Sequence, residues 1–360
     1  MKIERIESIV LLERFHIVRV FTDDGLVGLG EVSPMGPSVT HAFVEDVLTP
    51  LVVGRDPANI EHIWHDMYHV PHKLGPMGAQ LNAMAGIDIA LWDIAAQRAG
   101  VPLYVLLGGS VRDRVEVYAS SMSRDMEPVD EARRAARLRE QGYGWYKMHS
   151  ATRWMYDRGQ DRTVETVREV RAACGDDFQI MVDVNNAYLP HTAVRIARQL
   201  EDHGVFHFEE PIAEHDLDGY ARLVSKVDIA VAAGEQRYTR WQFLDLIQHG
   251  HVDIVQPDVV KCGGVTEFRK IAAVAGAFNR PVTVHNTQPV IGTMAHLHLW
   301  LSTQGCLYPQ EYNIERHALR DDWPLAAAGP VVENGFLLPP TRPGLGVELD
   351  EDVLAKIRTT

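Results

Sequence analysis

Residues 178–209, FQIMVDVNNAYLPHTAVRIARQLEDHGVFHFE, contain one complete unit of the pattern that decides the fold. The apolar run 178–184 ends in a polar loop, and the helical pattern in 193–200 places its apolar residues on one face. The next apolar run follows at 205–208. An apolar run, a loop, an amphipathic helix and a new run are typical of a βα unit in a parallel sheet.

The same alternation continues through most of the chain. Apolar runs that predict strands fall at 115–118, 145–148, 178–184, 205–208, 229–233, 253–256, 281–284 and 306–308. Eight such runs with helical patterns between them predict a closed α/β barrel rather than an open sheet.

The first hundred residues follow a different pattern. Apolar runs on either side of the turn at 22–25, which contains an Asp-Gly pair, predict a hairpin over 18–32. Helical patterns follow at 39–53, 58–69 and 77–99. We therefore expect an α+β module ahead of the barrel. The loop-rich segment from 329 does not continue the repeat, and we expect it to pack on that module.

Composition excludes several classes of protein. The 360 residues include 35 basic and 49 acidic side chains, a formal charge of -14, which disfavours nucleic-acid and membrane-surface partners. The three cysteines are scattered, so neither a disulfide framework nor a cysteine zinc site is expected. No stretch approaches about 18 apolar residues, and we expect a protein of the reducing cytoplasm.

Charged or imidazole side chains stand at the ends of the predicted strands. They are Lys147, His149, Asp183, Glu209, Glu235, Asp258, His285 and Glu311. From Asp183 onward the steps are 26, 26, 23, 27 and 26 residues, about one βα unit each. Because the C-terminal ends of barrel strands form one rim, we expect these side chains to converge on one cavity.

Asp183, Glu209 and Glu235 follow three consecutive strands. Three carboxylates that meet must raise their pKa values or share a cation. A set of oxygen ligands without cysteine favours a hard ion, and so few protein ligands are more typical of Mg²⁺ than of Ca²⁺. The alternative is that each carboxylate forms a separate salt bridge with Lys or Arg.

The other residues of the series have two interpretations each. Asp258 and His285 follow neighbouring strands, which predicts a general-base dyad, although a lone histidine is more often a satisfied polar residue. Lys147 and His149 point to the same face of a strand. They can serve as a second acid or base, or they can pair with the carboxylates. Glu311 is a hydrogen-bonding acid or the partner of an arginine. Lys261 is interpreted as a surface or loop residue.

The chain resembles the enolase superfamily, in the mandelate-racemase-like branch that includes acid-sugar dehydratases. The resemblance is carried by TDDGLVGLGE (22–31), GIDIALWDIAAQRAGVPLYVLLGG (86–109), MVDVNNAY (181–188), FEEP (208–211), AAGEQ (232–236), QPDVVKCGGVTE (256–267), VHNTQP (284–289) and PQE (309–311). It implies a capping α+β domain at 1–112, a modified TIM barrel, (β/α)₇β, at 113–328, and a C-terminal segment, 329–360, that completes the capping domain.

The resemblance also implies roles for individual residues. Asp183, Glu209 and Glu235 match the family's Mg²⁺ ligands, and Glu209 is chosen over Glu210 because the first acid of the EEP motif is the ligand. His285 matches the base. Asp258 matches its partner, Glu311 the acid that hydrogen-bonds the substrate carboxylate, and Asn185 an asparagine that assists in the racemases. His16 lies in the capping-domain segments that set specificity, so it is a candidate substrate-binding residue.

Two departures from the family pattern bear on the reaction. Galactonate dehydratases carry a catalytic histidine at the position of Asn185, which argues against galactonate as substrate. Racemases carry Lys-x-Lys where this chain has Lys147 and His149. A histidine there can protonate a departing hydroxide or return a proton to the opposite face of an intermediate.

We therefore expect a Mg²⁺-dependent dehydratase that removes the proton α to the carboxylate of an aldonate or aldarate and yields a 2-keto-3-deoxy acid. A racemase or epimerase with two bases is the enzyme alternative, distinguished by the absence of a keto product. A barrel that only binds a sugar acid is the non-enzyme alternative. The expected partners are the sugar-acid substrate, bound by Lys147 and Glu311 among others, and further copies of the chain in a homo-oligomer of even number.

Overall fold

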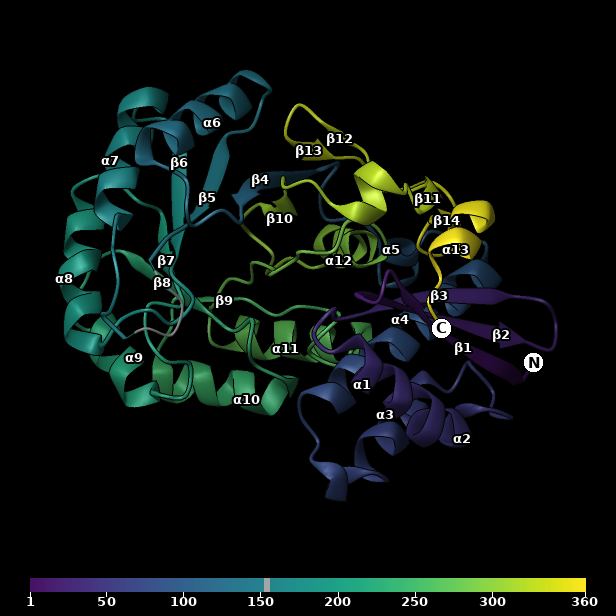
Figure 1. The fold of residues 1–360 in the computed structure, drawn as a ribbon. Helices are drawn as coiled ribbons and strands as arrows, with labels where there is room; N and C mark the ends of the chain where they lie inside the picture. The colour runs from purple at the N-terminus through teal and green to yellow at the C-terminus, as the bar shows by residue number, and fades with distance from the viewer. Residues whose placement is uncertain (152–155) are drawn as a thin grey trace.

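The computed structural model describes residues 1–151 and 156–360. Figure 1 shows a barrel of strands surrounded by helices beside a smaller unit of sheet and helices, with the C-terminal segment running along both. The barrel with an α+β unit ahead of it, predicted from the sequence, is confirmed.

The N-terminal unit is an antiparallel sheet of order β1-β2-β3 covered by helices. Its elements are β1 (Ile3–Leu11), β2 (Phe15–Thr22), β3 (Val27–Val32), α1 (Pro37–Ala42), η1 (Phe43–Leu48), α2 (Thr49–Val52), α3 (Ile60–His69), η2 (His72–Leu74), α4 (Ala79–Ala99) and α5 (Leu103–Leu106). The predicted hairpin is β2 and β3. The predicted helix over 39–53 comprises α1, η1 and α2, and β1 was not predicted.

Two glycines of β3 allow α4 to lie directly on the sheet. A Cβ at Gly30 would come within 1.8 Å of the Gly86 carbonyl oxygen, and one at Gly28 within 2.1 Å of the Ala90 carbonyl oxygen. Any side chain at these positions would push the helix away. The Gly-x-Gly of the sequence is thus a packing requirement of the capping unit.

The barrel is a continuous parallel ladder. Its strands are β4 (Val115–Ser121), β5 (Trp145–His149), β6 (Gln179–Asp183), β7 (His207–Glu209), β8 (Ala230–Ala233), β9 (Ile254–Val255) and β10 (Gln310–Asn313), and β10 pairs with β4. The helices between them are α6 (Pro128–Glu140), α7 (Thr163–Cys174), α8 (Pro190–Glu201), α9 (Leu217–Val224), α10 (Thr239–Asp245) continued by η3 (Leu246–Gly250), α11 (Val265–Ala277) and α12 (Ile291–Ser302).

Two of the predicted strands differ from those in the structure. The run at 281–284 forms only a bridge, between Val282 and Val255, because Pro281 and the loops around it interrupt the ladder. The run at 306–308 is not a strand, and β10 lies just after it at Gln310–Asn313, so Glu311 sits inside the strand instead of after it. Counted with the Val282 bridge, the described residues form the predicted (β/α)₇β order.

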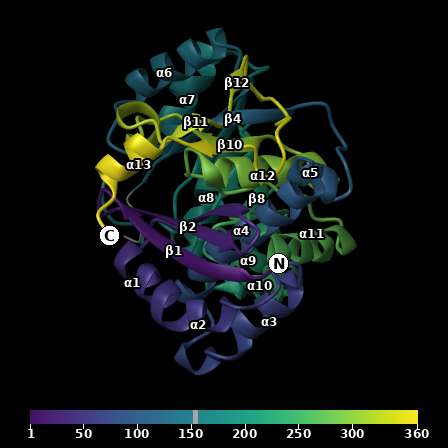
Figure 2. The same ribbon diagram turned by 90° about the vertical axis from the view of Figure 1, so that its right-hand side faces the viewer.

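The C-terminal segment contacts both units. After η4 (Ala318–Asp322) it forms β11 (Ala326–Ala328), β12 (Val332–Glu333), β13 (Phe336–Leu337), β14 (Glu348–Leu349) and α13 (Glu351–Ile357). β13 pairs with the start of β4, whereas Leu345 N–H donates to Asp93 of α4 at 2.7 Å and Leu11 of β1 bridges to Arg358. Figure 2 shows α13 beside the β1–β2 end of the sheet, as the sequence led us to expect.

Buried carboxylates of the capping unit bind the first turns of two barrel helices. Asp88 of α4 accepts the Thr266 N–H of α11 at 2.9 Å, and Glu31 of β3 accepts the Gly292 N–H of α12 at 2.7 Å. Burial raises the pKa of Asp88 to about 7 and that of Glu31 to about 8, although these hydrogen bonds act in the opposite direction. The two units are therefore joined by specific polar contacts as well as by apolar packing.

Among the residues that the structure describes, no helix is both long enough and apolar enough to span a bilayer.

Candidate active site

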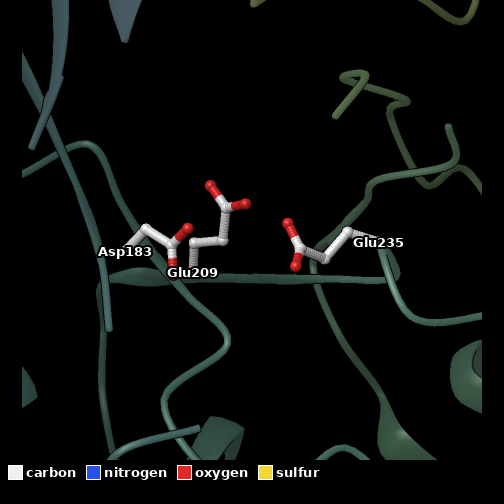
Figure 3. Close-up of side chains that lie close together, drawn as sticks. All are labelled: Asp183, Glu209 and Glu235. Atoms are coloured by element: carbon white, nitrogen blue, oxygen red, sulfur yellow. The ribbon is translucent and has the colours of Figure 1, made fainter. Parts of the chain in front are cut away.

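Three carboxylates meet at the C-terminal ends of neighbouring strands. Asp183 and Glu209 end β6 and β7 and are direct partners in the ladder, and Glu235 stands two residues after β8. One oxygen from each lies within 4.8 Å of the others. Figure 3 shows the three carboxylates turned toward a common space.

This cluster suits a hard divalent cation. Asp183 and Glu209 are fully buried, and Glu235 is 7% exposed. The Glu209 Oε1 atom is buried without a hydrogen-bond partner in the described part of the chain. Buried carboxylates this close need positive charge, and oxygen donors are the ligands that Mg²⁺ prefers. The residues present therefore fit a bound Mg²⁺.

Lys147 of β5 provides positive charge beside the cluster. Its Nζ atom lies 2.9 Å from Glu209 Oε2, 2.8 Å from Glu311 Oε1 and 3.8 Å from Asp183 Oδ2, and its side chain is fully buried. Burial lowers the pKa of Lys147, but Glu209 and Glu311 outweigh burial and hold it well above its ordinary value. Lys147 is thus a permanent cation.

His149, two residues along the same strand, is held between two acceptors. Its Nδ1 atom donates to the Ser121 carbonyl oxygen at 2.5 Å, and its Nε2 atom lies 2.8 Å from Asp183 Oδ2. Both contacts are satisfied together only when both ring nitrogens carry a proton. Burial raises the pKa of Asp183, but His149 and Lys147 lower it well below its usual range.

Asp258 and His285 form a hydrogen-bonded pair. His285 Nδ1 lies 2.8 Å from Asp258 Oδ2, and its Nε2 atom lies 3.1 Å from Glu235 Oε2. The other Asp258 oxygen accepts the Val260 N–H at 3.0 Å, which fixes the carboxylate. Burial lowers the pKa of His285, but Glu235 and Asp258 raise it overall to about 9. The ring therefore has a high proton affinity.

Glu311 closes the site opposite β5. Its Oε1 atom contacts Lys147 and accepts from the Ser120 hydroxyl at 2.7 Å, and its Oε2 atom accepts the Asn286 N–H at 2.7 Å. Each oxygen therefore has a donor, and the carboxylate is rigidly placed. Asn286 is adjacent to His285, so the hydrogen bond links this strand to the loop that carries the histidine.

Asn185 reaches the cluster from the loop after β6. The strand ends at Asp183, and Asn185 has φ +38°. Its N–H donates to Asp183 Oδ1 at 2.7 Å and its Nδ2 atom to Asp183 Oδ2 at 3.1 Å. Glu210, the second acid of the EEP motif, accepts from Asn186 at 3.3 Å and from Asn185 at 3.5 Å.

His16 is not brought to this site. It lies on β2 inside the capping unit, where its Nε2 atom bonds the Ser8 hydroxyl at 2.7 Å and its Nδ1 atom the Thr40 hydroxyl at 2.8 Å. The ring is fully buried, and burial followed by the proximity of His41 lowers its pKa to about 3. Both ring nitrogens are engaged within the unit, so the geometry does not support contact with a substrate.

Sequence reasoning missed two residues of the site. Lys261 lies in the loop between β9 and α11, as expected, but it is not a surface residue, because it is only 7% exposed and donates to Gln236. Arg124, after β4, donates to Asn185. Lys261 lies three residues after Asp258 and Arg124 six residues after the predicted strand 115–118, and that position near the rim was the available signal.

A cavity of about 590 Å³ opens beside His149, between the loops that follow β4 and β5. Its lining is polar and includes Arg124, Glu127, Ser150 and Arg162. Hydroxyl-rich molecules suit such a lining because each hydroxyl both donates and accepts hydrogen bonds.

Together these features define a class of barrel enzyme, with a capping α+β unit and a carboxylate centre at the strand ends. The model of the mandelate racemase / muconate lactonizing enzyme N-terminal domain matches residues 8–108, and the enolase C-terminal domain-like model matches residues 130–353. The chain therefore belongs to the enolase superfamily, in its mandelate racemase-like branch.

Individual relatives cover nearly the whole chain. The arabinonate dehydratase of Saccharolobus solfataricus is 32% identical over 94% of this chain and 88% of its own. The D-galactonate dehydratase of Ralstonia pickettii is 33% identical over 98% of this chain and 93% of its own. A mandelate racemase/muconate lactonizing protein from Paracoccus denitrificans, crystallised with magnesium, superposes with a TM-score of 0.93 at 33% identity, over 99% and 98% of the two chains.

Proposed function

We propose that the protein is a Mg²⁺-dependent dehydratase of a sugar acid. The observation that carries the proposal is the convergence of three carboxylates, Lys147 and the His285–Asp258 pair on one rim of the barrel. The two dehydratases among the relatives act, by their names, on arabinonate and D-galactonate, both of which are sugar acids. These names support dehydration over racemisation.

Asp183, Glu209 and Glu235 would hold the ion. Mg²⁺ bound there supplies positive charge that stabilises the negative charge developing on the substrate carboxylate. Lys147 adds a second positive charge beside the same group, and Glu311 holds Lys147 in place at 2.8 Å. The buried, preorganised charges act without reorganisation when the proton leaves.

His285 is the proposed base. Asp258 binds its Nδ1 atom and fixes the ring, and a cation held by Glu235 would offset the carboxylate charge that raises the pKa of His285, so that Nε2 is left to accept the α-proton of the substrate. Nε2 faces Glu235, one of the proposed ligands, so the ring lies next to the substrate carboxylate. The pair therefore removes a proton from the carbon beside the carboxylate, where the charge is stabilised.

His149 is the proposed acid. A ring whose two nitrogens both face acceptors is placed to hold a proton and to donate it from Nε2. The carbon–oxygen bond at the β-position then breaks, the hydroxyl leaves as water, and the enol that remains tautomerises to a 2-keto-3-deoxy acid.

The two-base racemase alternative is less well supported by the geometry. It needs a base that faces His285 across the substrate. Lys147 is tied to Glu209 and Glu311, and its raised pKa keeps it protonated. Lys147 is therefore not placed to accept a proton, and the names of the dehydratase relatives favour elimination over two-base chemistry.

The test is incubation with Mg²⁺ and a panel of aldonic and aldaric acids in D₂O, followed by proton NMR and a keto-acid assay. A keto product supports dehydration and identifies the substrate. Loss of the α-proton signal without a keto product would instead indicate racemisation or epimerisation. His285→Asn should abolish turnover and retain Mg²⁺ binding, and an active variant would remove the dyad from the mechanism.

A further inference from the structure

Lys261 is a buried cation that contacts the carboxylate cluster only through an amide. It is 7% exposed, and in the described part of the chain its Nζ atom forms no salt bridge. It donates instead to Gln236 Oε1 at 3.4 Å, and Gln236 Nε2 donates to Glu235 Oε1 at 2.6 Å. A lysine, an amide and a proposed metal ligand thus form a chain of hydrogen bonds.

The same arrangement occurs at a second proposed ligand. The guanidinium of Arg124 donates to Asn185 Oδ1, and Asn185 Nδ2 donates to Asp183 Oδ2 at 3.1 Å. Glu209 needs no such relay, because Lys147 contacts its Oε2 atom directly at 2.9 Å. Each of the three carboxylates therefore has a lysine or arginine linked to it, directly or through one amide, in addition to His149 beside Asp183 and His285 beside Glu235.

The chemistry of the amide explains how these cations can orient a carboxylate that they do not contact directly. A carboxamide has one acceptor oxygen and an NH₂ group with two donors, so a cation that binds the oxygen turns the NH₂ group toward the carboxylate. The carboxylate oxygen that accepts this hydrogen bond is fixed, and the orientation of the whole group is fixed with it. Partners of this kind commonly contribute a 10–100-fold change in metal affinity.

We propose that Lys261 and Arg124 are positioning residues that hold Glu235 and Asp183 in the geometry needed for the ion, through Gln236 and Asn185. The proposal rests on the metal site of the proposed function. It concerns how the ligands are held, not whether they bind.

Lys261 gives the cleaner test, because Arg124 also donates to the Ser150 and Ala151 carbonyl oxygens and its loss would disturb a loop. Lys261→Met removes the ammonium and retains the stem. If Lys261 were only a nearby positive charge, its removal would strengthen binding of a cation. If Lys261 orients Gln236, its removal weakens Mg²⁺ binding. The two explanations therefore predict opposite changes in the Mg²⁺ dissociation constant.

The experiment is calorimetric titration of the metal-free protein with Mg²⁺, with no substrate present. Lys261→Met and Gln236→Leu should each raise the Mg²⁺ dissociation constant about 10-fold or more. The double variant should be no weaker than the weaker single variant, because both changes break the same chain. Lys261→Arg, which retains a donor, should recover most of the affinity. Lys226→Met, at an exposed position with the same charge change, should have the affinity of the unaltered protein.

Several results would overturn the proposal. Unchanged or tighter Mg²⁺ binding by Lys261→Met does so, as do additive losses in the double variant. Gln236 is only partly buried, so Gln236→Leu tests the relay even if the lysine variant does not fold. If the unaltered protein dehydrates a sugar acid and the variants bind Mg²⁺ normally, the relay alone is wrong. If the unaltered protein binds no Mg²⁺, the relay and the proposed metal site fail together.

Discussion

Replacement of Lys147 by methionine removes the central cation of the site and retains its apolar stem. The Nζ atom lies 2.9 Å from Glu209 Oε2 and 2.8 Å from Glu311 Oε1, with all three side chains fully buried. At an effective dielectric constant of about 20, each contact corresponds to about 6 kcal/mol of Coulomb energy before desolvation. Removing one partner of a buried pair typically costs about 3–5 kcal/mol, because the remaining charge stays buried without compensation.

We therefore expect Lys147→Met to lower the free energy of unfolding by about 3–5 kcal/mol at pH 7 in the absence of metal. The loss should depend on pH. Burial raises the pKa of Glu209, but Lys147 lowers it overall to about 2, against 4.5 in the unfolded chain. The stabilisation from this carboxylate is complete above pH 4.5 and disappears as the pH falls through 2. The difference between the two proteins should narrow by about 1 kcal/mol or more from pH 7 to pH 4.

Urea unfolding in EDTA at pH 7 and pH 4, followed by tryptophan fluorescence, measures both quantities. Lys226→Met, on the exposed surface, should change the free energy by less than about 0.5 kcal/mol. A Lys147→Met protein that unfolds at the same urea concentration as the unaltered protein would refute the reasoning, and so would a difference that is the same at both pH values.

Three further predictions follow from the contacts. Asp258→Asn should lower kcat on the order of 10³-fold or more without preventing Mg²⁺ binding, since the carboxylate that orients His285 is lost; steady-state kinetics and titration check this. Mg²⁺ at 100 times its dissociation constant should stabilise the protein by about 2.7 kcal/mol, and EDTA or Asp183→Asn should remove that gain in thermal unfolding. Burial raises the pKa of Glu31 to about 8, so the stability that the protonated side chain contributes is complete below pH 4.5 and is lost as the pH rises through 8. Relative to Glu31→Gln, the free energy of unfolding of the unaltered protein should fall by about 1.4 kcal/mol per pH unit between pH 5 and pH 8, measured by urea unfolding.

Each of these has an outcome that would contradict it. Full activity in Asp258→Asn would show that His285 needs no orienting carboxylate. Stabilisation by Mg²⁺ that persists in Asp183→Asn would place the ion elsewhere. A constant stability difference between the unaltered protein and Glu31→Gln across the pH range would mean that Glu31 is ionised throughout.

The strand ends were predictable because they obey a strict geometric rule. Parallel strands of one barrel end on one rim, and a repeat of about 26 residues places Asp183, Glu209 and Glu235 at the same level. Apolar periodicity and turn chemistry gave the barrel and the hairpin of the capping unit. These signals are local in the chain, so a single sequence contains them.

The residues that were missed or wrongly placed depend on information that is not local. Gly234 has φ +137° and Asn185 φ +38°, so the chain leaves the strand direction there and alternation no longer says where a side chain points. His16 and His149 are both histidines, but their surroundings differ. The ring of His16 is enclosed because α1, which carries Thr40, packs against β2. Lys261 is buried in a loop where it donates to Gln236, which follows a different strand, and the local sequence shows only that the residue stands near the rim.

The contacts that Asp88 and Glu31 make with barrel helices have a consequence for protein engineering. Helices α11 and α12 begin just after the loops that carry Asp258 and His285. By binding the first turns of these helices, the capping unit helps to position the two residues proposed to transfer the proton. Exchange of capping units between relatives to alter substrate choice would therefore also exchange these anchors. A chimera should preserve both carboxylates, together with Gly28 and Gly30, which set the distance between β3 and α4.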